Sequence, residues 1–411
     1  MSDCCSAPGL MPFESALENM LSQIVPVTET FALPITQALN YVLAQKIASP
    51  INVPNHDNSA MDGYAFAIES LSQDKTLTMV GRSMAGAPFQ GECKLGECIR
   101  IMTGAKMPAC CDSVEMQENV QAVEDNITFL KEKTLGSHVR IAGEDIQLGQ
   151  QVFNQGHKIT AVDIGILASL GVSEVKVYRK VKVALIATGD ELKLPGQALN
   201  SGDIYESNSF VLRGMLDKLH IDVIDFGIIE DDFELIKSAF ISADNQADAV
   251  ISSGGVSVGD ADYTKTVLDD LGEIGFWKIA MKPGKPFAFG KLPNSIFFGL
   301  PGNPVSALVT FHQLAIVALT KMQNGQVLKR TNLQVKCKSD LNKSPGRMDF
   351  QRGVLSVNEQ GENVVESTGS QGSGILSSLS KANCFIVLPS EQGKVKAGEM
   401  VTVQLFDQFI C

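Results

Sequence analysis

The chain has 411 residues, more than one hydrophobic core usually holds, so we expect two to four domains. Its hydrophobic content of 44% and charged content of 19% are those of a globular protein and exclude a disordered chain. The formal net charge of −12 argues against a broad surface for nucleic acid or for an anionic membrane, although a few local cations could still hold a small anion.

The N-terminal segment predicts two helices and no signal peptide. The stretch MSDCCSAPGL has neither a basic start nor an apolar core. Apolar residues recur at helical spacing over residues 13–24, and Pro26 stands where that helix must stop. A second helical stretch is predicted over residues 35–47, after Pro34.

Residues 49–151 predict an inserted β-rich domain, because glycines and prolines punctuate short apolar runs such as LTMVG, ECIRIMTG and NITFLKEK. A capped helix follows, with Thr160 as N-cap, Asp163 at the third position and Gly171 as its stop. We expect this helix to pack on the N-terminal helices. Residues 1–48 and 152–180 would then form one discontinuous helical domain.

Residues 181–329 alternate between strands and helices, which predicts an α/β domain with a mostly parallel sheet. VKVALIAT, DVIDFGII and DAVISS are the strand candidates, and helices are predicted over residues 207–220 and 231–243. FAFGKLPNSIFFGL predicts a hairpin, and a long helix should follow Pro304.

Two further features complete the outline of the fold. The apolar run 305–320 is too short, and with His312 and Gln313 too polar, to span a bilayer. The runs LQVKCK, CFIVLP and MVTVQLF predict a small, barrel-like all-β domain over residues 330–411. We therefore expect a soluble, cytoplasmic α/β and β multidomain protein.

The nine cysteines show no CxxC pair and no metal-ligand spacing. Their number is odd, and some are vicinal, as in Cys4-Cys5 and Cys110-Cys111. We expect reduced thiols without a functional role.

Ligands of open parallel sheets bind at the carboxyl ends of the strands, and three acidic motifs are predicted to lie there. They are ATGDEL with Glu191, IIEDDFEL with Asp231, and SSGGVSVGDADYTK with Asp260 and Asp262. Each motif alone is equally consistent with a turn or a helix cap, and Asp231 with Glu234 resembles a capping box. Together they favour a site where Mg²⁺ joins carboxylates to a phosphate.

The third motif also carries glycines that let backbone amides approach a phosphate, so Gly254, Gly255 and Ser257 are candidate substrate-binding residues. The segment FWKIAMKPGKPFAFG supplies the opposite charge through Lys278, Lys282 and Lys285. We expect the acidic and lysine residues to share one hollow at the sheet's edge.

The segment GLPGNPVSAL begins the long helix, with Asn303 as N-cap and Pro304 as first residue. Exposed amides at this helix start could receive an anion, although capping explains the same residues. No Walker A run, GxGxxG, GxSxG or HExxH motif is present, so the corresponding nucleotide-binding and hydrolase classes lack their signatures.

The series DNSAMDGYA, IRIMTGA, GED, TGDEL, SSGGVSVGDADYTK, KPGKPFAFG and LPGNPVSAL, in this order and spacing, closely resembles the molybdopterin molybdenumtransferase family. This is the bacterial MoeA type, related to the E domain of gephyrin, and the resemblance covers nearly the whole chain. It implies a homodimer of four-domain subunits with a molybdopterin-binding α/β domain. It also implies insertion of molybdate into adenylylated molybdopterin, with Mg²⁺ and with release of AMP.

The resemblance also implies site residues. The catalytic set is Asp62, Thr103, Glu191, Lys278 and Lys282; the substrate-binding residues are Asp145, Pro301 and Pro304; and the metal ligands are Asp231 and Asp262. The family's site lies where the α/β domain of one subunit faces the inserted domain of the other. The segment SQGSG is a further candidate contributor to the site. The upstream molybdopterin adenylyltransferase is a candidate partner. A protein-binding scaffold and a Mg²⁺-dependent nucleotide phosphohydrolase remain the alternatives.

Overall fold

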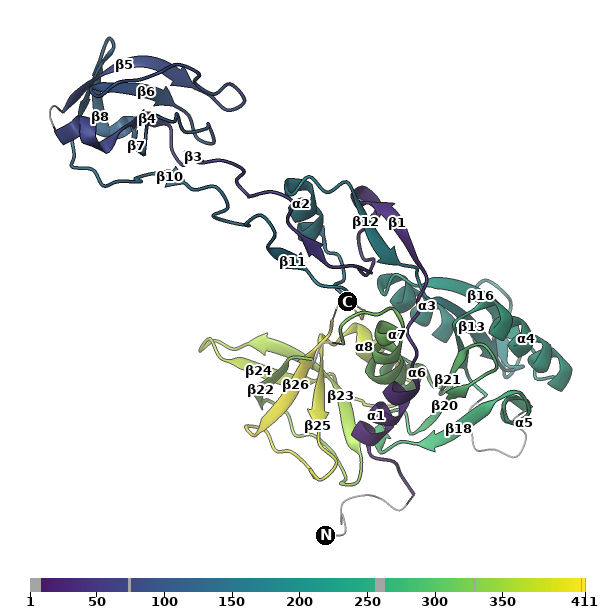
Figure 1. The fold of residues 1–411 in the computed structure, drawn as a ribbon. Helices are drawn as coiled ribbons and strands as arrows, with labels where there is room; N and C mark the ends of the chain where they lie inside the picture. The colour runs from purple at the N-terminus through teal and green to yellow at the C-terminus, as the bar shows by residue number, and fades with distance from the viewer. Residues whose placement is uncertain (1–8, 73–74, 256–262, 328–329, 408, 411) are drawn as a thin grey trace, which may run out of the picture. The chain divides into compact units, whose positions relative to one another are not determined.

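A computed structural model describes residues 9–72, 75–255, 263–327, 330–407 and 409–410 (Figure 1). The chain divides into two compact units. Unit 1 comprises Met1–Phe31, Asn40–Val42 and Val177–Cys411, and unit 2 comprises Ala32–Leu39 and Leu43–Lys176.

A six-stranded sheet in the order β16-β13-β17-β21-β20-β18 forms the centre of unit 1. The first four strands are parallel, and β20 and β18 run antiparallel to their neighbours. The strands are β13 (Lys182–Thr188), β16 (Asp222–Ile229), β17 (Ala249–Ser253), β18 (Glu273–Lys278), β20 (Pro286–Lys291) and β21 (Ile296–Leu300). The mostly parallel sheet and the hairpin between β20 and β21 confirm the sequence prediction.

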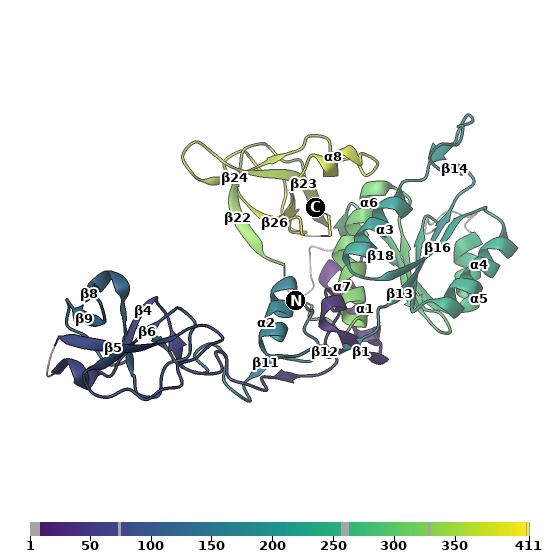
Figure 2. The same cartoon turned by 90° about the horizontal axis from the view of Figure 1, so that it is seen from above.

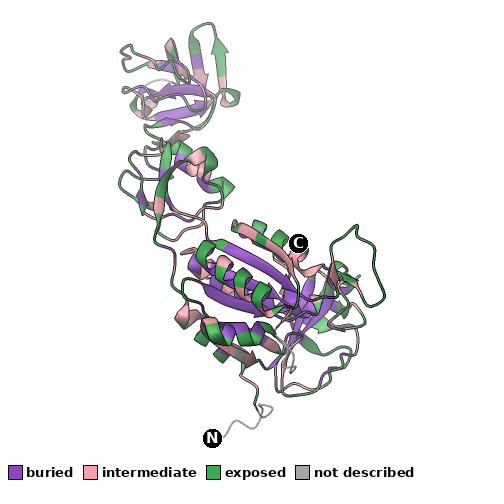
Figure 3. Ribbon diagram, turned by 90° about the vertical axis from the view of Figure 1, so that its right-hand side faces the viewer, coloured by how far each residue is buried: buried purple, intermediate pink, exposed green. Residues whose placement is uncertain are grey.

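Helices cover both faces of this sheet, as Figure 2 shows, and the sheet separates two hydrophobic cores. Val183 and Leu185 of β13 pack in one core, and Ala184 and Ile186 pack in the other. The helices are α1 (Phe13–Gln23), α3 (Asn208–Lys218), α4 (Phe233–Gln246), α5 (Tyr263–Leu271), α6 (Pro304–Thr310) and α7 (Ile316–Met322). Because both faces are covered, the central strands are buried along almost their whole length (Figure 3).

The helical run from Pro304 to Met322 is continuous, with a π-helical segment, Phe311–Ala315, between α6 and α7. By length and composition it could cross a membrane. However, 83% of its most apolar window is buried inside the protein, as expected for a core helix. His312 is buried in this run and bonds Asp407, which explains how the core accommodates its polar side chain.

The C-terminal part of unit 1 is a second six-stranded sheet, in the order β19-β23-β24-β22-β26-β25, which closes through pairing of β23 with β25. Its strands are β19 (Met281–Lys282), β22 (Asn332–Cys337), β23 (Met348–Val357), β24 (Asn363–Ser367), β25 (Cys384–Leu388) and β26 (Met400–Leu405), with the short helix α8 (Ser377–Ser380). The predicted barrel-like domain is confirmed. The strand β19 belongs to the lysine segment, so pairing with β23 holds that segment against the barrel.

Unit 2 contains a β-rich sheet in the order β7-β4-β6-β5-β9-β8. Its strands are β4 (Gly63–Phe66), β5 (Thr76–Ser83), β6 (Glu97–Ile101), β7 (Ser113–Met116), β8 (Val120–Val123) and β9 (Asn126–Phe129). The short pairs β3 (Asn58–Ser59) with β10 (Val139–Arg140) and β2 (Ile47–Ala48) with β11 (Gln151–Phe153) extend from it. The helix α2 (Ala161–Ser169) has the predicted capping box of Thr160 and Asp163.

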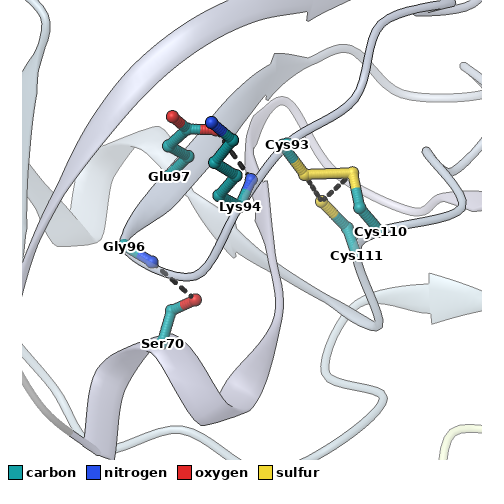
Figure 4. The surroundings of a disulfide bond; sticks show 7 residues. All are labelled: Ser70, Cys93, Lys94, Gly96, Glu97, Cys110 and Cys111. Atoms are coloured by element: carbon teal, nitrogen blue, oxygen red, sulfur yellow. Dashed lines mark hydrogen bonds between the residues drawn. A yellow bond between two sulfur atoms is a disulfide. The ribbon is translucent and has the colours of Figure 1, made fainter.

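Two expectations for this region are wrong. The only helical turn in residues 35–47 is the 3₁₀ turn Ile35–Gln37, because the backbone amides of Leu43 and Ala44 donate to the carbonyls of His157 and Lys176 instead of continuing a helix. Nor are all cysteines free thiols, since Cys93 and Cys110 form a disulfide beside Cys111 (Figure 4).

Candidate active site

The motifs of the α/β part meet along one edge of the sheet in unit 1. The ends of β16, β13, β17 and β21 lie level, because Ile229 pairs with Thr188, Ala187 with Ser253, and Ser253 with Leu300. The antiparallel strand β20 begins at this edge, and Lys278, at the end of β18, pairs with Pro286 there. The sequence therefore correctly predicted one shared edge.

Carboxylates gather at the β16 end of this edge. The backbone amide of Asp231 donates to Asp190 Oδ1 at 2.9 Å, which joins the turn after β13 to the turn after β16. Burial, followed by the charges of Asp190 and Glu191, raises the pKa of Asp231. Since like charges remain close together here, a cation at this point would be stabilised.

The alternative role of Asp231 as a helix cap is wrong. The N-cap of α4 is Asp232, whose side chain accepts a hydrogen bond from Leu235 N at 3.0 Å. Asp232 therefore caps the helix, and the carboxylate of Asp231 belongs to the acidic group at the sheet edge.

The glycine-rich turn after β17 lies between the two ends of the edge. Gly254 and Gly255 have φ values of +95° and +64°, and a Cβ on Gly255 would lie 2.3 Å from Thr264 Oγ1 and 2.9 Å from Thr188 Oγ1. These positions therefore require glycine for both conformation and space. Three other residues of this motif, Ser257, Asp260 and Asp262, lie outside the described residues, so their predicted roles are not tested.

Asn208, at the start of α3, connects two strand ends at this edge. Its Nδ2 donates to Ser253 Oγ at 2.9 Å and to the carbonyl of Gly302 at 2.8 Å. No sequence motif pointed to Asn208, since an asparagine at the start of a helix is common. It stabilises the glycine turn against the segment that follows β21.

A cleft of about 720 Å³ opens at the lysine end of the edge. Lys282, Lys285 and Pro301 line it, with Asn303 and Ser306 from the start of the long helix. Of the residues predicted to share a hollow, Lys282 and Lys285 line this cleft, whereas Lys278 and Asp231 do not, and the predicted substrate-binding residue Pro304 does not line it either. The residues expected to share one hollow therefore form two groups along the edge, the carboxylates at the β16 end and the cleft at the lysine end.

The C-terminal barrel supplies the other wall of the cleft. Arg347, Gln351 and Ser367 line it, together with Gln371 and Ser373 of the SQGSG segment. Sequence analysis named the segment only as a candidate and missed Arg347. Its signal is weak, because the basic residue stands in an unremarkable loop, SPGRMDF, and only the closed barrel brings it to the lysines.

The cleft is cationic, and buried groups support its charge. Lys282 Nζ lies 3.5 Å from Asp349 Oδ2, and Asp349 is 3% exposed. Burial lowers the pKa of Lys343; the charges of Asp349 and Glu391 oppose this shift, and those of Lys282 and Arg347 add to it. Three cations thus lie within electrostatic range of one another, which favours an incoming anion.

The predicted use of helix-start amides for an anion is wrong for Val305. Its amide donates to the carbonyl of Ser373 at 3.0 Å, which joins α6 to the SQGSG segment. The Asn303 side chain makes no capping hydrogen bond, although the residue stands at the N-cap. It lines the cleft instead.

The candidate residues of unit 2 form a separate arrangement. Thr103 donates from its backbone amide and from its hydroxyl to Asp62 Oδ1, each at 2.7 Å. These hydrogen bonds, the backbone one first, lower the pKa of Asp62, so its carboxylate stays ionised at neutral pH. Asp145 is exposed in a loop whose Ala142 amide donates to Asp57 Oδ1 at 2.7 Å, so the three predicted motifs are joined.

Comparison with known proteins identifies the family. The chain matches the MoeA N-terminal region (domains I and II) over residues 11–171, a probable molybdopterin-binding domain over 184–321, and the MoeA C-terminal region (domain IV) over 334–406. It is 48% identical to the molybdopterin molybdenumtransferase of Haemophilus influenzae over 403 residues, which cover 98% of this chain and 100% of that one. The chain belongs to the molybdopterin molybdenumtransferase family.

Two more distant relatives support the assignment. Gephyrin of Dictyostelium discoideum is 32% identical over 96% of this chain and 62% of its own length. The crystal structure of the molybdopterin biosynthesis protein MoeA from Pyrococcus horikoshii superposes with a TM-score of 0.84 at 29% identity, over 97% of this chain and 100% of that one. The chain is thus a transferase of molybdenum cofactor biosynthesis.

Proposed function

We propose that the chain inserts molybdate into adenylylated molybdopterin, with Mg²⁺-dependent release of AMP. The observation that carries the proposal is the charge separation along one sheet edge in unit 1. Carboxylates stand after β13 and β16, and a cationic cleft begins at β20. Five strand spacings of about 4.8 Å separate the outermost strands, so the edge is about 24 Å long, enough for a pterin joined to a nucleotide through a diphosphate.

The acidic end fits a Mg²⁺ ion by the chemistry of its donors. Glu191 and Asp231 are carboxylates of exposed residues. Partial burial of the carboxyl and then the charges of Asp190 and Glu191 raise the pKa of Asp231, which supports a role for a cation beside these groups. Mg²⁺ prefers one or two such carboxylates together with substrate phosphates, and when bound it would neutralise diphosphate charge. From the sequence we add Asp262 to this set.

The cleft fits molybdate, a tetrahedral dianion. Lys282 and Lys285 supply ammonium groups and Arg347 supplies a planar guanidinium. Neutral donors line the same space, among them Ser306 and Gln371. In the proposed reaction these residues bind and orient the oxyanion, while the dithiolene sulfurs that receive molybdenum belong to the substrate.

The glycine turn between the two groups would hold the diphosphate. Gly254 and Gly255 bring backbone close to Thr188, with no side chain in the way. Backbone amides of such turns bind phosphate oxygens. Because the turn follows β17, between the acidic turns and the cleft, a diphosphate bound there would lie between the proposed metal ligands and the oxyanion.

The direct test supplies purified protein with adenylylated molybdopterin, molybdate and Mg²⁺. AMP and molybdenum cofactor should appear together, and chelation of Mg²⁺ should suppress both. No AMP above a protein-free blank would refute the proposal. Rapid hydrolysis of ATP without any pterin would favour the phosphohydrolase instead.

Asp231→Asn tests the metal role within this assay. Because the substitution removes a carboxylate but keeps the shape, we expect turnover to fall about 10- to 100-fold and to need more Mg²⁺. Asp244→Asn, in the same helix-strand layer but bonded to Asn294 and Ser295, should leave the Mg²⁺ dependence unchanged. An unchanged Mg²⁺ dependence in Asp231→Asn would contradict the assignment.

We further propose that the enzyme acts as a homodimer, in which Asp62, Thr103 and Asp145 of one subunit serve the cleft of the other. This explains why candidate residues occur in two compact units. The test mixes two inactive variants, Asp62→Ala and Lys282→Ala, under conditions that allow subunit exchange. With two sites per dimer, random exchange should restore about one quarter of wild-type activity, whereas complete inactivity of the mixture would contradict shared sites.

A further inference from the structure

Three cysteines of unit 2 bring their sulfur atoms together. Cys93 and Cys110 form a disulfide, and Cys111 Sγ lies 3.9 Å from the sulfur of each, as Figure 4 shows. Within the described part of the chain this is the one group of three metal-binding side chains whose ligand atoms lie within 4.8 Å of one another. The proposed reaction uses none of these thiols.

The fold, and not a sequence motif, creates this group. Cys93 precedes β6, and Cys110 and Cys111 precede β7; both strands pair with β4 from opposite sides. Further hydrogen bonds anchor the loops, since the amide of Gly96 donates to Ser70 Oγ and the amide of Cys111 donates to the carbonyl of Pro108. These contacts fix the loops that carry the three sulfurs.

We propose that, once the disulfide is reduced, Cys93, Cys110 and Cys111 form a three-thiolate site for a soft metal ion, with Cu(I) as the best match. Thiolate ligands select soft ions such as Cu(I) over hard ions such as Mg²⁺. For metal–sulfur bonds of about 2.3 Å, three sulfurs around one ion lie about 4 Å apart. The two distances from Cys111 already have this value.

The number of ligands in the group favours Cu(I) over Zn²⁺. Structural Zn²⁺ sites take four ligands, usually Cys or His. Among the described residues no His, Asp or Glu joins the three cysteines within 4.8 Å. Cys98 is fully buried in β6 and lies outside the group. Three sulfur ligands without a fourth donor suit a three-coordinate ion.

Redox chemistry would control this site. A dithiol reductant donates two electrons and two protons to the Cys93–Cys110 disulfide, giving two thiols and the oxidised reductant; Cu(I) then displaces thiol protons.

The three cysteines are half-buried, so an ion could reach them from solvent. The test uses the full chain with Cys4→Ser and Cys5→Ser, which removes the other vicinal pair. Protein is reduced with dithiothreitol, desalted without oxygen and titrated with Cu(I) against the chelator bathocuproine disulfonate. We expect one Cu(I) per chain, and none in the disulfide form.

Two variants sharpen the measurement. Cys111→Ser keeps the disulfide pair and should weaken Cu(I) binding at least about tenfold. Cys384→Ala, a buried thiol in the barrel, should leave binding unchanged, and circular dichroism checks that both variants fold. Equal affinity in Cys111→Ser, no competition with the chelator, or tighter binding of Zn²⁺ than of Cu(I) would each overturn the proposal.

Discussion

The two ends of the sheet edge in unit 1 are built in different ways. At the acidic end, Asp190 and Asp231 come from turns after two adjacent parallel strands and are joined by one hydrogen bond. At the cationic end, Lys282 comes from the segment before β20, and Arg347 comes from the barrel. The acidic group follows from strand pairing alone, whereas the cationic cleft exists only because β19 pairs with β23.

The two ends also differ in how their charge is balanced. Burial and then the neighbouring carboxylates Asp190 and Glu191 raise the pKa of Asp231, so like charges lie close together there. The cation Lys282 has the buried Asp349 as a partner at 3.5 Å. In the proposed reaction the acidic end would bind the metal ion, and the cationic end, whose charge is partly balanced by Asp349, would bind the substrate oxyanion.

Loss of Lys282 should have the largest effect. Lys282→Ala removes the ammonium group that faces the cleft, and we expect turnover to fall about 10²- to 10³-fold, as for other groups that stabilise developing charge. Lys291→Ala is the control, since Lys291 stands at the opposite end of β20. Steady-state AMP release measures both, and a similar decline in the two variants would contradict a specific role.

Arg347 tests whether the barrel wall binds the oxyanion. Arg347→Gln should raise the KM for molybdate about 10- to 100-fold, while Arg347→Lys should recover part of it, because charge returns without the planar fork. Molybdate titrations at fixed pterin concentration measure the change. An unchanged KM in Arg347→Gln would restrict oxyanion binding to the lysine side.

Gly255 connects the two ends, and its substitution should affect stability. Gly255→Ala places a Cβ at positive φ and within 2.3 Å of Thr264 Oγ1, so we expect a loss of more than the roughly 1–2 kcal/mol of a left-handed residue. Gly361→Ala also has positive φ, +80°, but meets open space. Urea unfolding should show a larger loss for Gly255→Ala; equal losses would mean that the turn can relax.

Two adjacent aspartates should have opposite, small effects on stability. The raised pKa of Asp231 means that its stabilising contribution is present at acid pH and lost as pH rises through the folded-state value. Asp231→Asn should therefore increase the free energy of unfolding at neutral pH by roughly a few tenths of a kcal/mol, after solvent screening. Asp232→Ala should decrease it by about 1 kcal/mol, because a helix cap is lost.

Urea melts at pH 7 and at pH 3.5 separate these two effects. The gain in Asp231→Asn should vanish at the lower pH, since the wild-type carboxyl is then protonated. At pH 7 the free energy of unfolding of Asp232→Ala should be lower than that of the wild type, because the lost helix cap does not depend on the ionisation of Asp231. A gain in Asp231→Asn that persists in acid would exclude like-charge repulsion as its cause.

Much of this protein was determined by local sequence. The period of apolar residues predicted the parallel strands, α1 and α4, and the turn chemistry predicted the hairpin before β21 and the capping box of α2. The shared sheet edge followed from the rule that parallel strands end on the same side. These features depend on neighbours along the chain or on adjacent strands, so a single sequence contains them.

Tertiary structure decided the rest. Residues 35–47 have helical spacing, but their amides bond distant carbonyls. Arg347 reaches the lysines because the barrel closes, and Cys93 reaches Cys111 because β6 and β7 flank the same strand. Such contacts join residues far apart in the chain, and their free energy comes from packing that no local pattern records. Sequence therefore determined the strands and the motifs, whereas long-range packing determined which side chains meet.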